Sequence, residues 1–224
     1  MIFVDYIINI MPSLLSGALI TLKVFFWTLI ISIPLGIILS LGLTSKFTNK
    51  KMLKIFSIKQ LIEFYIWLMR GTPLLLQLIF VFYGLPIIGI VFQRYDAALV
   101  AFSLNYAAYF AEIFRGGFQS IPKSQYESAS MLGLNSWQTT RKVIIPQVLK
   151  IVIPSIGNEV INLVKDSSLV YVIGIGDLLQ AGNIATARDV TLLPLILVAL
   201  IYLLLTALCT VILRRIEKYY SSWR

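Results

Sequence analysis

The sequence predicts an all-α membrane protein with about five transmembrane helices, and its composition and long apolar runs support that prediction. Of its 224 residues, 58% are hydrophobic and only 13% are charged. The mean hydropathy is +0.88, and the apolar fraction is well above that of ordinary soluble domains. Residues 24–45, 71–93 and 190–213 carry no charge, and each run is long enough to cross a hydrocarbon layer roughly 30 Å thick, which takes about 20 helical residues.

We expect one transmembrane domain over residues 1–224, with spans at about 16–45, 60–92, 96–113, 148–172 and 190–213. The third span contains the uncharged run 97–111, between Asp96 and Glu112. The fourth is apolar apart from a polar cluster at its centre. The N-terminus lacks the basic start and small-residue cleavage site of a signal peptide, so we expect it to be retained as an interfacial helix that runs on into the first span.

The lysines and arginines predict the orientation, because short loops rich in these residues stay in the cytoplasm. They follow the first, third and fifth spans, whereas the opposite loops hold only Arg94 and Arg188. The N-terminus is therefore expected outside and the C-terminus inside. The basic residues on the predicted cytoplasmic side are Lys46, Lys50, Lys51, Lys54, Lys59, Arg115, Lys123, Arg141, Lys142, Arg214, Arg215, Lys218 and Arg224. This topology accounts for the formal net charge of +9, so we expect no nucleic-acid partner.

Residue usage argues against several kinds of chemistry. The chain has no histidine and one cysteine, Cys209, which excludes an internal disulfide and histidine-based catalysis and speaks against a zinc site. It has no glycine-rich phosphate loop of the G-x-x-x-x-G-K-[ST] kind, so any ATP must be used by another chain. We therefore expect no catalytic residue, no metal site and no cofactor bound by this chain, which is not an enzyme.

Residues 126–147 form the most polar long segment and predict two short helices joined at Gly133. Ser124 and Glu127 fit a capping box at the start of the first helix. Gly133 suits the left-handed position just past the end of that helix, and Asn135 or Ser136 can cap the second. Pro146 can begin the following span or bend the junction.

Three interpretations of this hairpin compete. Ala129 and Gly133 match the spacing of a DNA-binding helix–turn–helix, but spans hold the hairpin at both ends and it has no stripe of basic residues. The hairpin could lie on the bilayer surface as an amphipathic element. It could also dock on a cytoplasmic partner through apolar side chains, namely Tyr126, Met131, Leu132, Leu134 and Trp137.

The spacing favours docking, because it resembles the "EAA" loop of permease subunits of ATP-binding-cassette importers. That pattern has Glu-Ala-Ala, three residues, Gly, nine residues and Ile-x-Leu-Pro. Here Glu127-Ser128-Ala129, Gly133 and Val143-Ile144-Ile145-Pro146 stand at the same spacing. The resemblance implies that residues of about 115–146 form a cytoplasmic coupling loop that fits a cleft in an ATPase subunit. The coupling residues it implies are Tyr126, Glu127, Ala129, Leu132, Gly133 and Leu134.

Other segments resemble the polar amino-acid uptake branch of these permeases, the histidine-, arginine- and glutamine-type proteins. They are "RGTPLLLQLIFVFYGLP" (70–86), "NYAAYFAEIFRGG" (105–117), "IIPQVLKIVIPSIGNEVINLVKDSSLV" (144–170) and "GDLLQAG" (176–182). This resemblance implies a multi-pass chain in the lipid of a bacterial cytoplasmic membrane, paired with a second permease copy or homologue. It also implies two ATPase subunits that hold ATP and Mg, an extracytoplasmic solute-binding protein, and alternating access coupled to ATP hydrolysis.

The fourth span carries polar side chains at membrane depth, where an ionisable residue costs ~2.5–3.5 kcal/mol on insertion scales. Their spacing puts most of them on one broad helix face; they are Asn158, Glu159, Asn162, Lys165 and Asp166. Lys165 and Asp166, near the span end, could simply meet water or Asn162. Glu159 lies deeper, and we interpret it as a functional residue.

The second candidate site is Arg70-Gly71-Thr72-Pro73, where Pro73 removes a backbone donor and Gly71 weakens the helix before it. We expect a broken helix that presents donors to a substrate carboxylate, although a kink used only for packing is an equal alternative. Arg70 with the Gly71 and Thr72 backbone would bind the carboxylate, and Glu159 the ammonium.

Asn105 and Asn162 complete the predicted substrate pathway, although Asn105 could equally make a hydrogen bond between helices. The spans carry too little charge to hold a second substrate charge. We therefore favour a polar neutral amino acid, or cystine, over a cationic one.

Two other classes of protein are alternatives to an ATP-driven importer. A secondary transporter driven by an ion gradient would show two hydrophobic halves related by an internal repeat, and no such repeat is evident. A purely structural membrane subunit would leave Glu159 and the Gly71–Pro73 break unexplained.

Overall fold

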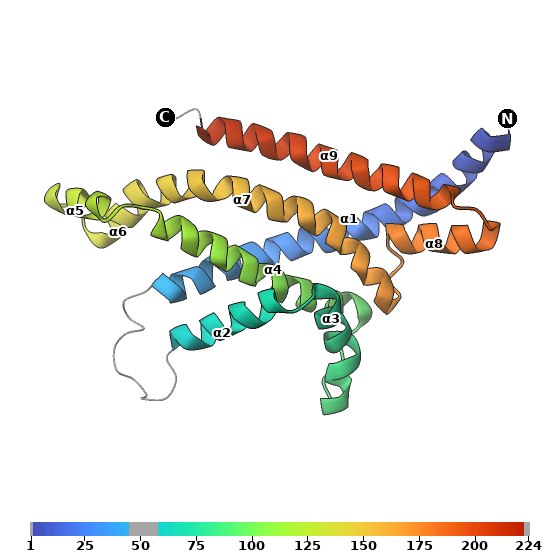
Figure 1. Cartoon of the computed structure of the whole chain (residues 1–224), viewed down its shortest axis with the longest axis horizontal. Helices are drawn as coiled ribbons and strands as arrows, with labels where there is room; N and C mark the ends of the chain where they lie inside the picture. The colour runs from blue at the N-terminus through green and yellow to red at the C-terminus, as the bar shows by residue number, and fades with distance from the viewer. Residues whose placement is uncertain (1, 45–57, 222–224) are drawn as a thin grey trace. The chain divides into compact units, whose positions relative to one another are not determined.

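The computed structural model describes residues 2–44 and 58–221, and within these residues it is helical without any strand. Figure 1 shows the helices in chain order. The α-helices are α1 (Ile2–Thr44), α2 (Ile58–Gly71), α3 (Leu74–Ile79), α4 (Arg94–Gln119), α5 (Lys123–Met131), α6 (Ser136–Thr139), α7 (Ile145–Asp166), α8 (Leu178–Asp189) and α9 (Leu193–Ser221). Shorter π or 3-10 segments are η2 (Phe80–Gly84), η3 (Leu85–Ile88), η4 (Thr140–Ile144) and η5 (Ser167–Ile173).

The lengths of the described helices confirm the all-α membrane fold. Four are long and apolar enough to cross a bilayer: Val4–Leu43, Arg94–Gln119, Ser136–Ile173 and Leu193–Tyr220. The pair Ile58–Gly71 and Leu74–Ile88, broken at Thr72 and Pro73, makes a fifth if it is counted as one span.

The first helix, α1, runs without a break from Ile2 to Thr44. The N-terminal stretch and the predicted first span thus form one continuous helix. The orientation remains a prediction. Ser45, at the end of the predicted first span, and several of the basic residues behind the orientation lie outside the described residues; these basic residues are Lys46, Lys50, Lys51, Lys54 and Arg224.

Contacts divide the chain into two compact units, each assembled from three separate segments. The first unit comprises Met1–Ile31, Thr72–Leu104 and Val160–Thr210. The second comprises Ser32–Gly71, Asn105–Glu159 and Val211–Arg224.

In the first unit, the start of α8 is fixed by the buried carboxylate of Asp177. Asp177 is the N-cap of α8 and accepts hydrogen bonds from the backbone N–H groups of Leu179 (3.1 Å) and Gln180 (3.0 Å). The hydroxyl of Tyr202 donates to the same carboxylate at 3.3 Å. Burial raises the pKa of Asp177 even though these donors favour its charged form. The buried, desolvated carboxylate of Asp177 therefore links the start of α8 to Tyr202 of α9.

The first helix packs directly against this cap. A Cβ placed on Gly17 would lie 2.7 Å from the carbonyl oxygen of Asp177 and 2.9 Å from the Cα of Leu178. The N–H of Leu178 donates to Oγ1 of Thr21 at 3.2 Å. Glycine is needed here because the two backbones approach too closely for any side chain.

The other end of α8 is also tied to α1. The hydroxyl of Tyr6 donates to Asp189 at 2.6 Å, and Arg188 donates to the same carboxylate at 2.6 and 2.7 Å. Hydrogen bonds from Arg188 and then Tyr6 lower the pKa of Asp189 to about 2. Asp189 therefore stays ionised at all ordinary pH values.

In the second unit, small residues let α2 and the end of α1 pack closely on α4. Ile66 and Leu43 are buried with Ala108 and Ala111 of α4. A Cβ on Gly36 would lie 2.6 Å from Cβ of Phe110. Small side chains in residues 105–111 of α4 thus allow neighbouring helix backbones to approach closely.

We expect Gly17→Ala to destabilise the protein by about 1–3 kcal/mol, because the added methyl group would meet backbone atoms that cannot move aside. Gly116→Ala is the matched control, since a Cβ there meets no atom within 4 Å and alanine favours the helix. Thermal unfolding of the purified variants in detergent measures the difference. Equal midpoints for the two variants would contradict the close approach of α1 to Asp177.

Candidate functional site

The turn of the polar hairpin has the geometry that Gly133 was expected to provide. Gly133 follows α5 with a φ of 73°. The N–H of Leu134 donates to the carbonyl of Ala129 (3.1 Å), and that of Gly133 donates to Ser130 (3.0 Å). These are the two bonds of a Schellman motif, which satisfies the free carbonyls at a helix end. The turn is therefore built from backbone bonds that require a left-handed residue.

The second helix of the hairpin begins with a complete capping box at Asn135. Its side chain accepts from the N–H of Gln138 at 2.9 Å, and the side chain of Gln138 accepts from the N–H of Asn135 at 3.1 Å. This confirms Asn135 over Ser136 as the cap. Both sides of the turn are thereby fixed by local hydrogen bonds.

The capping box predicted at Ser124 and Glu127 is wrong. The N-cap of α5 is Pro122, and no side chain caps this helix. Proline has its φ fixed near the helical value, here −60°, and with a ψ of 144° it turns the chain directly into the helix. Ser124 therefore lies inside the first turn, where it cannot act as the cap, and Glu127 is left exposed.

The hairpin joins the following span through a widened turn. Helix α6 has only four residues and passes into the π turn η4, which contains Arg141 and Lys142. Helix α7 begins at Ile145, so Pro146 is its second residue. Pro146 therefore follows the π turn directly, and its missing N–H falls where the ladder of bonds changes from π to α.

The predicted coupling residues surround an apolar surface on this hairpin. Its large hydrophobic side chains are exposed, namely Tyr126 (39%), Met131 (91%), Leu132 (80%) and Trp137 (68%). We call these four residues the docking tip. Below the tip, Ala129 is only 3% exposed and Leu134 is half-buried. The tip thus rests on a small packed base and leaves apolar area available for a partner.

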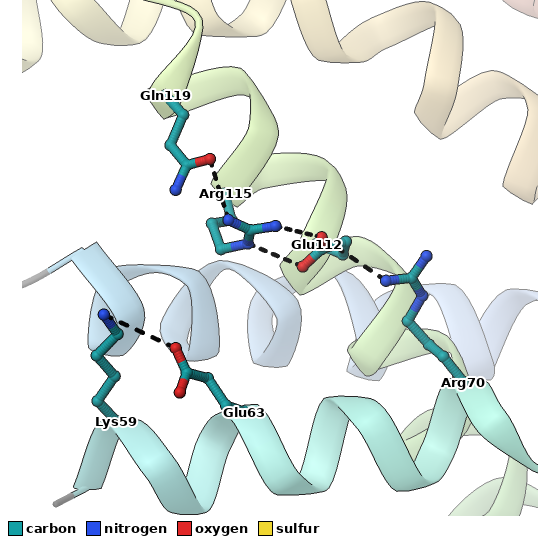
Figure 2. A network of polar contacts seen from close by, with 6 residues as sticks. All are labelled: Lys59, Glu63, Arg70, Glu112, Arg115 and Gln119. Atoms are coloured by element: carbon teal, nitrogen blue, oxygen red, sulfur yellow. Dashed lines mark hydrogen bonds and ion pairs between the residues drawn. The ribbon is translucent and has the colours of Figure 1, made fainter.

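A second cluster, at the centre of Figure 2, is a charged network on α2 and α4. Glu112 accepts two hydrogen bonds from Arg115, one of them at 2.9 Å, and Arg115 also donates to Gln119 at 3.0 Å. Arg70 reaches the same carboxylate from α2 at 3.7 Å, which is the distance of an ion pair rather than a short hydrogen bond. Lys59 and Glu63 form a further pair at 3.7 Å.

Helix periodicity explains why these side chains meet. Glu112, Arg115 and Gln119 stand three and four residues apart, so they share one face of α4. Arg70 comes from the last turn of α2 and lies over the ring of Tyr109, 5.3 Å from its centroid. The ring and Glu112 together hold the guanidinium in place.

The network lines an open pocket of about 500 Å³ within the second unit. Its lining consists of Leu43, Glu63, Ile66, Trp67, Arg70, Gly71, Glu112 and Arg115. Two carboxylates and two guanidinium groups balance each other there. Apolar side chains, including the exposed Trp67, form the rest of the wall. Such a pocket offers donors and acceptors to a small molecule that carries both charges.

The structure confirms the helix break after Arg70. Helix α2 ends at Gly71, and Pro73 takes an extended conformation with a ψ of 135° as the N-cap of α3. Oγ1 of Thr72 accepts from the side chain of Gln77 at 2.7 Å. A Cβ on Gly71 would meet no atom within 4 Å, so the backbone at the break is open.

Asn105 belongs to the packing of α4 against α2. It is buried, and its Nδ2 donates to the carbonyl of Met69 at 2.9 Å. That carbonyl lies in the last turn of α2, where helix bonding leaves acceptors free. This bond favours the interpretation of Asn105 as a link between helices.

The polar face of the fourth span is not part of this pocket. Glu159 is half-buried in the second unit, whereas Asn162 is exposed in the first. Lys165 is exposed, and Asp166 ends α7. The roles predicted for Glu159 and Asn162 therefore stay predictions.

Sequence reasoning missed Glu112 and Arg115, because Glu112 served only to mark the end of an uncharged run. The available signal was their spacing. A Glu and an Arg three residues apart on an apolar helix can form an ion pair, and such a pair within a span indicates a functional site.

The fold and hairpin define a multi-pass helical membrane component with a structured hairpin, exposed at its tip, between two of its spans. Residues 32–221 match the family described as "Binding-protein-dependent transport system inner membrane component". The chain belongs to this family, which comprises permease subunits of ATP-binding-cassette systems.

Individual relatives place the chain near the amino-acid branch, as the sequence resemblance indicated. It is 39% identical to the arginine transport system permease protein ArtQ of Bacillus subtilis over 213 residues, covering 94% of each chain. It is 37% identical to the probable amino-acid permease protein YckA of the same organism, covering 95% of this chain and 91% of YckA.

Solved structures agree with this placement. The chain in the "Crystal structure of an amino acid ABC transporter with histidines" is 33% identical, with a TM-score of 0.85 over 96% of this chain and 97% of that chain. A chain of the MetNI methionine transporter has the same fold at 20% identity, with a TM-score of 0.73 over 95% of this chain and 98% of that chain.

We expect Asn135→Ala to loosen the start of α6 by about 1 kcal/mol, because it removes the side-chain oxygen that accepts from the N–H of Gln138. Asn135→Asp should retain the cap and serves as the control. Amide hydrogen exchange over residues 136–145 reports the opening. Unchanged exchange in Asn135→Ala would show that tertiary contacts, not the cap, hold the hairpin.

Proposed function

We propose that this chain is the permease subunit of an ATP-driven importer that moves a polar amino acid across a bacterial cytoplasmic membrane. The observation that carries the proposal is the hairpin of residues 123–144, whose turn and cap are locked and whose docking tip is exposed. The family assignment and the names of its amino-acid relatives support it. The partners would be two ATPase subunits, a second permease and an extracytoplasmic solute-binding protein.

The connections of the hairpin suggest how ATP could drive it. Its first helix follows α4 after a short turn, and its second continues through η4 into α7. Where α4 and α7 meet, a Cβ on Gly117 would lie 2.3 Å from a methyl group of Val152. A push on the docking tip would therefore move α4 and α7 together. We infer that closure of the ATPase pair on ATP binding opens the permease outward and that hydrolysis resets it, which is alternating access.

The charged pocket supports a zwitterionic substrate. Glu112 is already engaged by two hydrogen bonds from Arg115, so the longer contact with Arg70 leaves the Arg70 guanidinium able to bind a carboxylate. The formal charges of the pocket lining sum to zero, so the lining has no additional carboxylate to pair with a cationic side chain of the substrate. We therefore favour a polar neutral amino acid, or cystine, even though ArtQ is named for arginine.

Further substrate contacts are proposed from the sequence. Glu159, which does not line the charged pocket, would accept the ammonium group at another point of the substrate pathway, as an ionisable residue in a span is costly unless it serves a function. The backbone of Gly71 and Thr72 would assist Arg70 with the carboxylate, and Asn162 would add an amide. Asn105 contributes through its bond to the end of α2.

Uptake of labelled amino acids into proteoliposomes tests the proposal. The vesicles would contain this chain, its ATPase and its binding protein, with ATP enclosed or absent. We expect accumulation only with ATP, strongest for neutral polar amino acids or cystine. Uptake that ignores ATP but follows an imposed ion gradient would instead establish a secondary transporter.

We expect Gly133→Pro to abolish ATP-driven uptake while the membrane helices stay folded. Proline cannot adopt a φ of 73° and lacks the N–H that Gly133 donates to Ser130. Gly133→Asn should retain most activity, because asparagine tolerates the left-handed region. Normal ATP-driven uptake by vesicles reconstituted with Gly133→Pro would contradict the docking interpretation.

We expect Arg70→Lys to reduce uptake at least about tenfold, because lysine cannot bind a carboxylate with a planar fork. Glu159→Gln should also weaken transport while leaving assembly intact. Both are measured as initial uptake rates at increasing substrate concentration. Lys59→Gln, which removes an exposed charge that does not line the pocket, is the control. Wild-type uptake kinetics in Arg70→Lys and Glu159→Gln would show that these two residues have only a structural role.

A further inference from the structure

A second open pocket, of about 450 Å³, lies between the first half of α7 and the end of α9. Both segments belong to the second unit. Its lining consists of Lys150, Ile153, Pro154, Arg214, Glu217, Lys218 and Tyr220. Nothing in the proposed transport mechanism uses these residues.

The packing of the two helices closes this pocket at one end. A Cβ on Gly157 of α7 would lie 3.5 Å from Oε1 of Glu217 and 3.7 Å from Leu213 of α9. The glycine thus brings the helices together beside Leu213. The pocket lies on the side of this contact toward the start of α7 and the end of α9, where Lys150 and Lys218 are exposed.

The sequence puts this opening at the edge of the hydrocarbon layer. Residues 190–213 carry no charge, and Arg214 follows them directly. Tyr219 and Tyr220 stack edge to face just beyond, with ring centroids 5.4 Å apart. Tyrosines and basic residues at a span end mark the depth of lipid headgroups.

Charge and apolar surface meet at the pocket. Three basic side chains and one carboxylate give it a formal charge of +2. Beside it, exposed apolar side chains run back into the uncharged part of the span: Val211 (51%) and Ile212 (50%) on α9, and Ile151 (45%) on α7. An occupant must therefore be anionic at one end and apolar at the other.

We propose that this pocket binds the phosphate of an anionic phospholipid. Arg214, Lys150 and Lys218 would bind the phosphate, since basic pockets between transmembrane helices are suited to anionic headgroups. The acyl chains would lie along Val211, Ile212 and Ile151. Glu217 opposes the anion, so a headgroup with a single phosphate fits better than one with several. The binding class is a glycerophospholipid with one net negative charge.

The test compares lipids on the purified full-length chain by native mass spectrometry in a neutral detergent. The probes are phosphatidylglycerol and phosphatidylcholine with identical acyl chains. We expect phosphatidylglycerol to bind preferentially. Arg214→Gln and Lys150→Gln should each weaken that binding about fivefold, the effect of one basic residue at an anionic surface. Glu217→Gln should strengthen it, because a repelling charge is lost.

Arg215→Gln is the matched control, because Arg215 is adjacent in sequence and exposed but does not line the pocket. Arg214→Lys, which keeps the charge, should retain most binding and separates loss of the site from loss of the fold. Equal binding of the two lipids, or an equal loss in Arg215→Gln, overturns the proposal. Full displacement by millimolar inorganic phosphate would also overturn it, by showing a site for free anions. Uptake of substrate is a separate measurement, so either proposal can fail alone.

Discussion

In hydrocarbon a peptide group finds no water, so every backbone N–H and C=O must find its partner within the protein. This constraint makes the described chain helical almost throughout, and it gives the few interruptions their importance. At Thr72 and Pro73 the helix is broken, and the side chain of Gln77 donates to Thr72. Before α8 the carboxylate of Asp177 takes the free N–H groups. These two interruptions are each closed by a specific side chain, and each therefore depends on the residues around it.

The charged network on α2 and α4 obeys a related rule for side chains. A lone charge within a span is costly, but Glu112 is shared by Arg115 and Arg70, and the flat ring of Tyr109 supports Arg70. Half-exposed ion pairs of this kind contribute little to stability, about 0–1 kcal/mol. Their value lies in fixing where the donors point. The network fixes the guanidinium of Arg70 but leaves some of its N–H groups available, which suits reversible binding of a small anionic group.

The features predicted correctly from sequence were those set by a few neighbouring residues. Gly133 and Asn135 act within one turn of the chain, and Pro73 breaks the helix wherever that helix lies. Ser124 was misjudged because Pro122, two residues earlier, starts the helix first. Glu112 was overlooked because its meaning depends on Arg70, 42 positions away, and no local pattern brings α2 beside α4. The polar residues of the fourth span could be placed on a helix face, but their partners depend on packing that periodicity does not contain.

The π turn η4 sets the rotational phase between the hairpin and the span that follows it. A π turn holds one residue more than an α turn, and each residue of an α-helix advances the chain by about 100°. The direction in which Trp137 faces, relative to the side chains of α7, is therefore determined by the number of residues between them as well as by their identity. Shortening Thr140–Ile144 by one residue would leave every side chain of the docking tip present and rotate the tip by about 100° relative to α7. In this segment, chain length itself carries positional information.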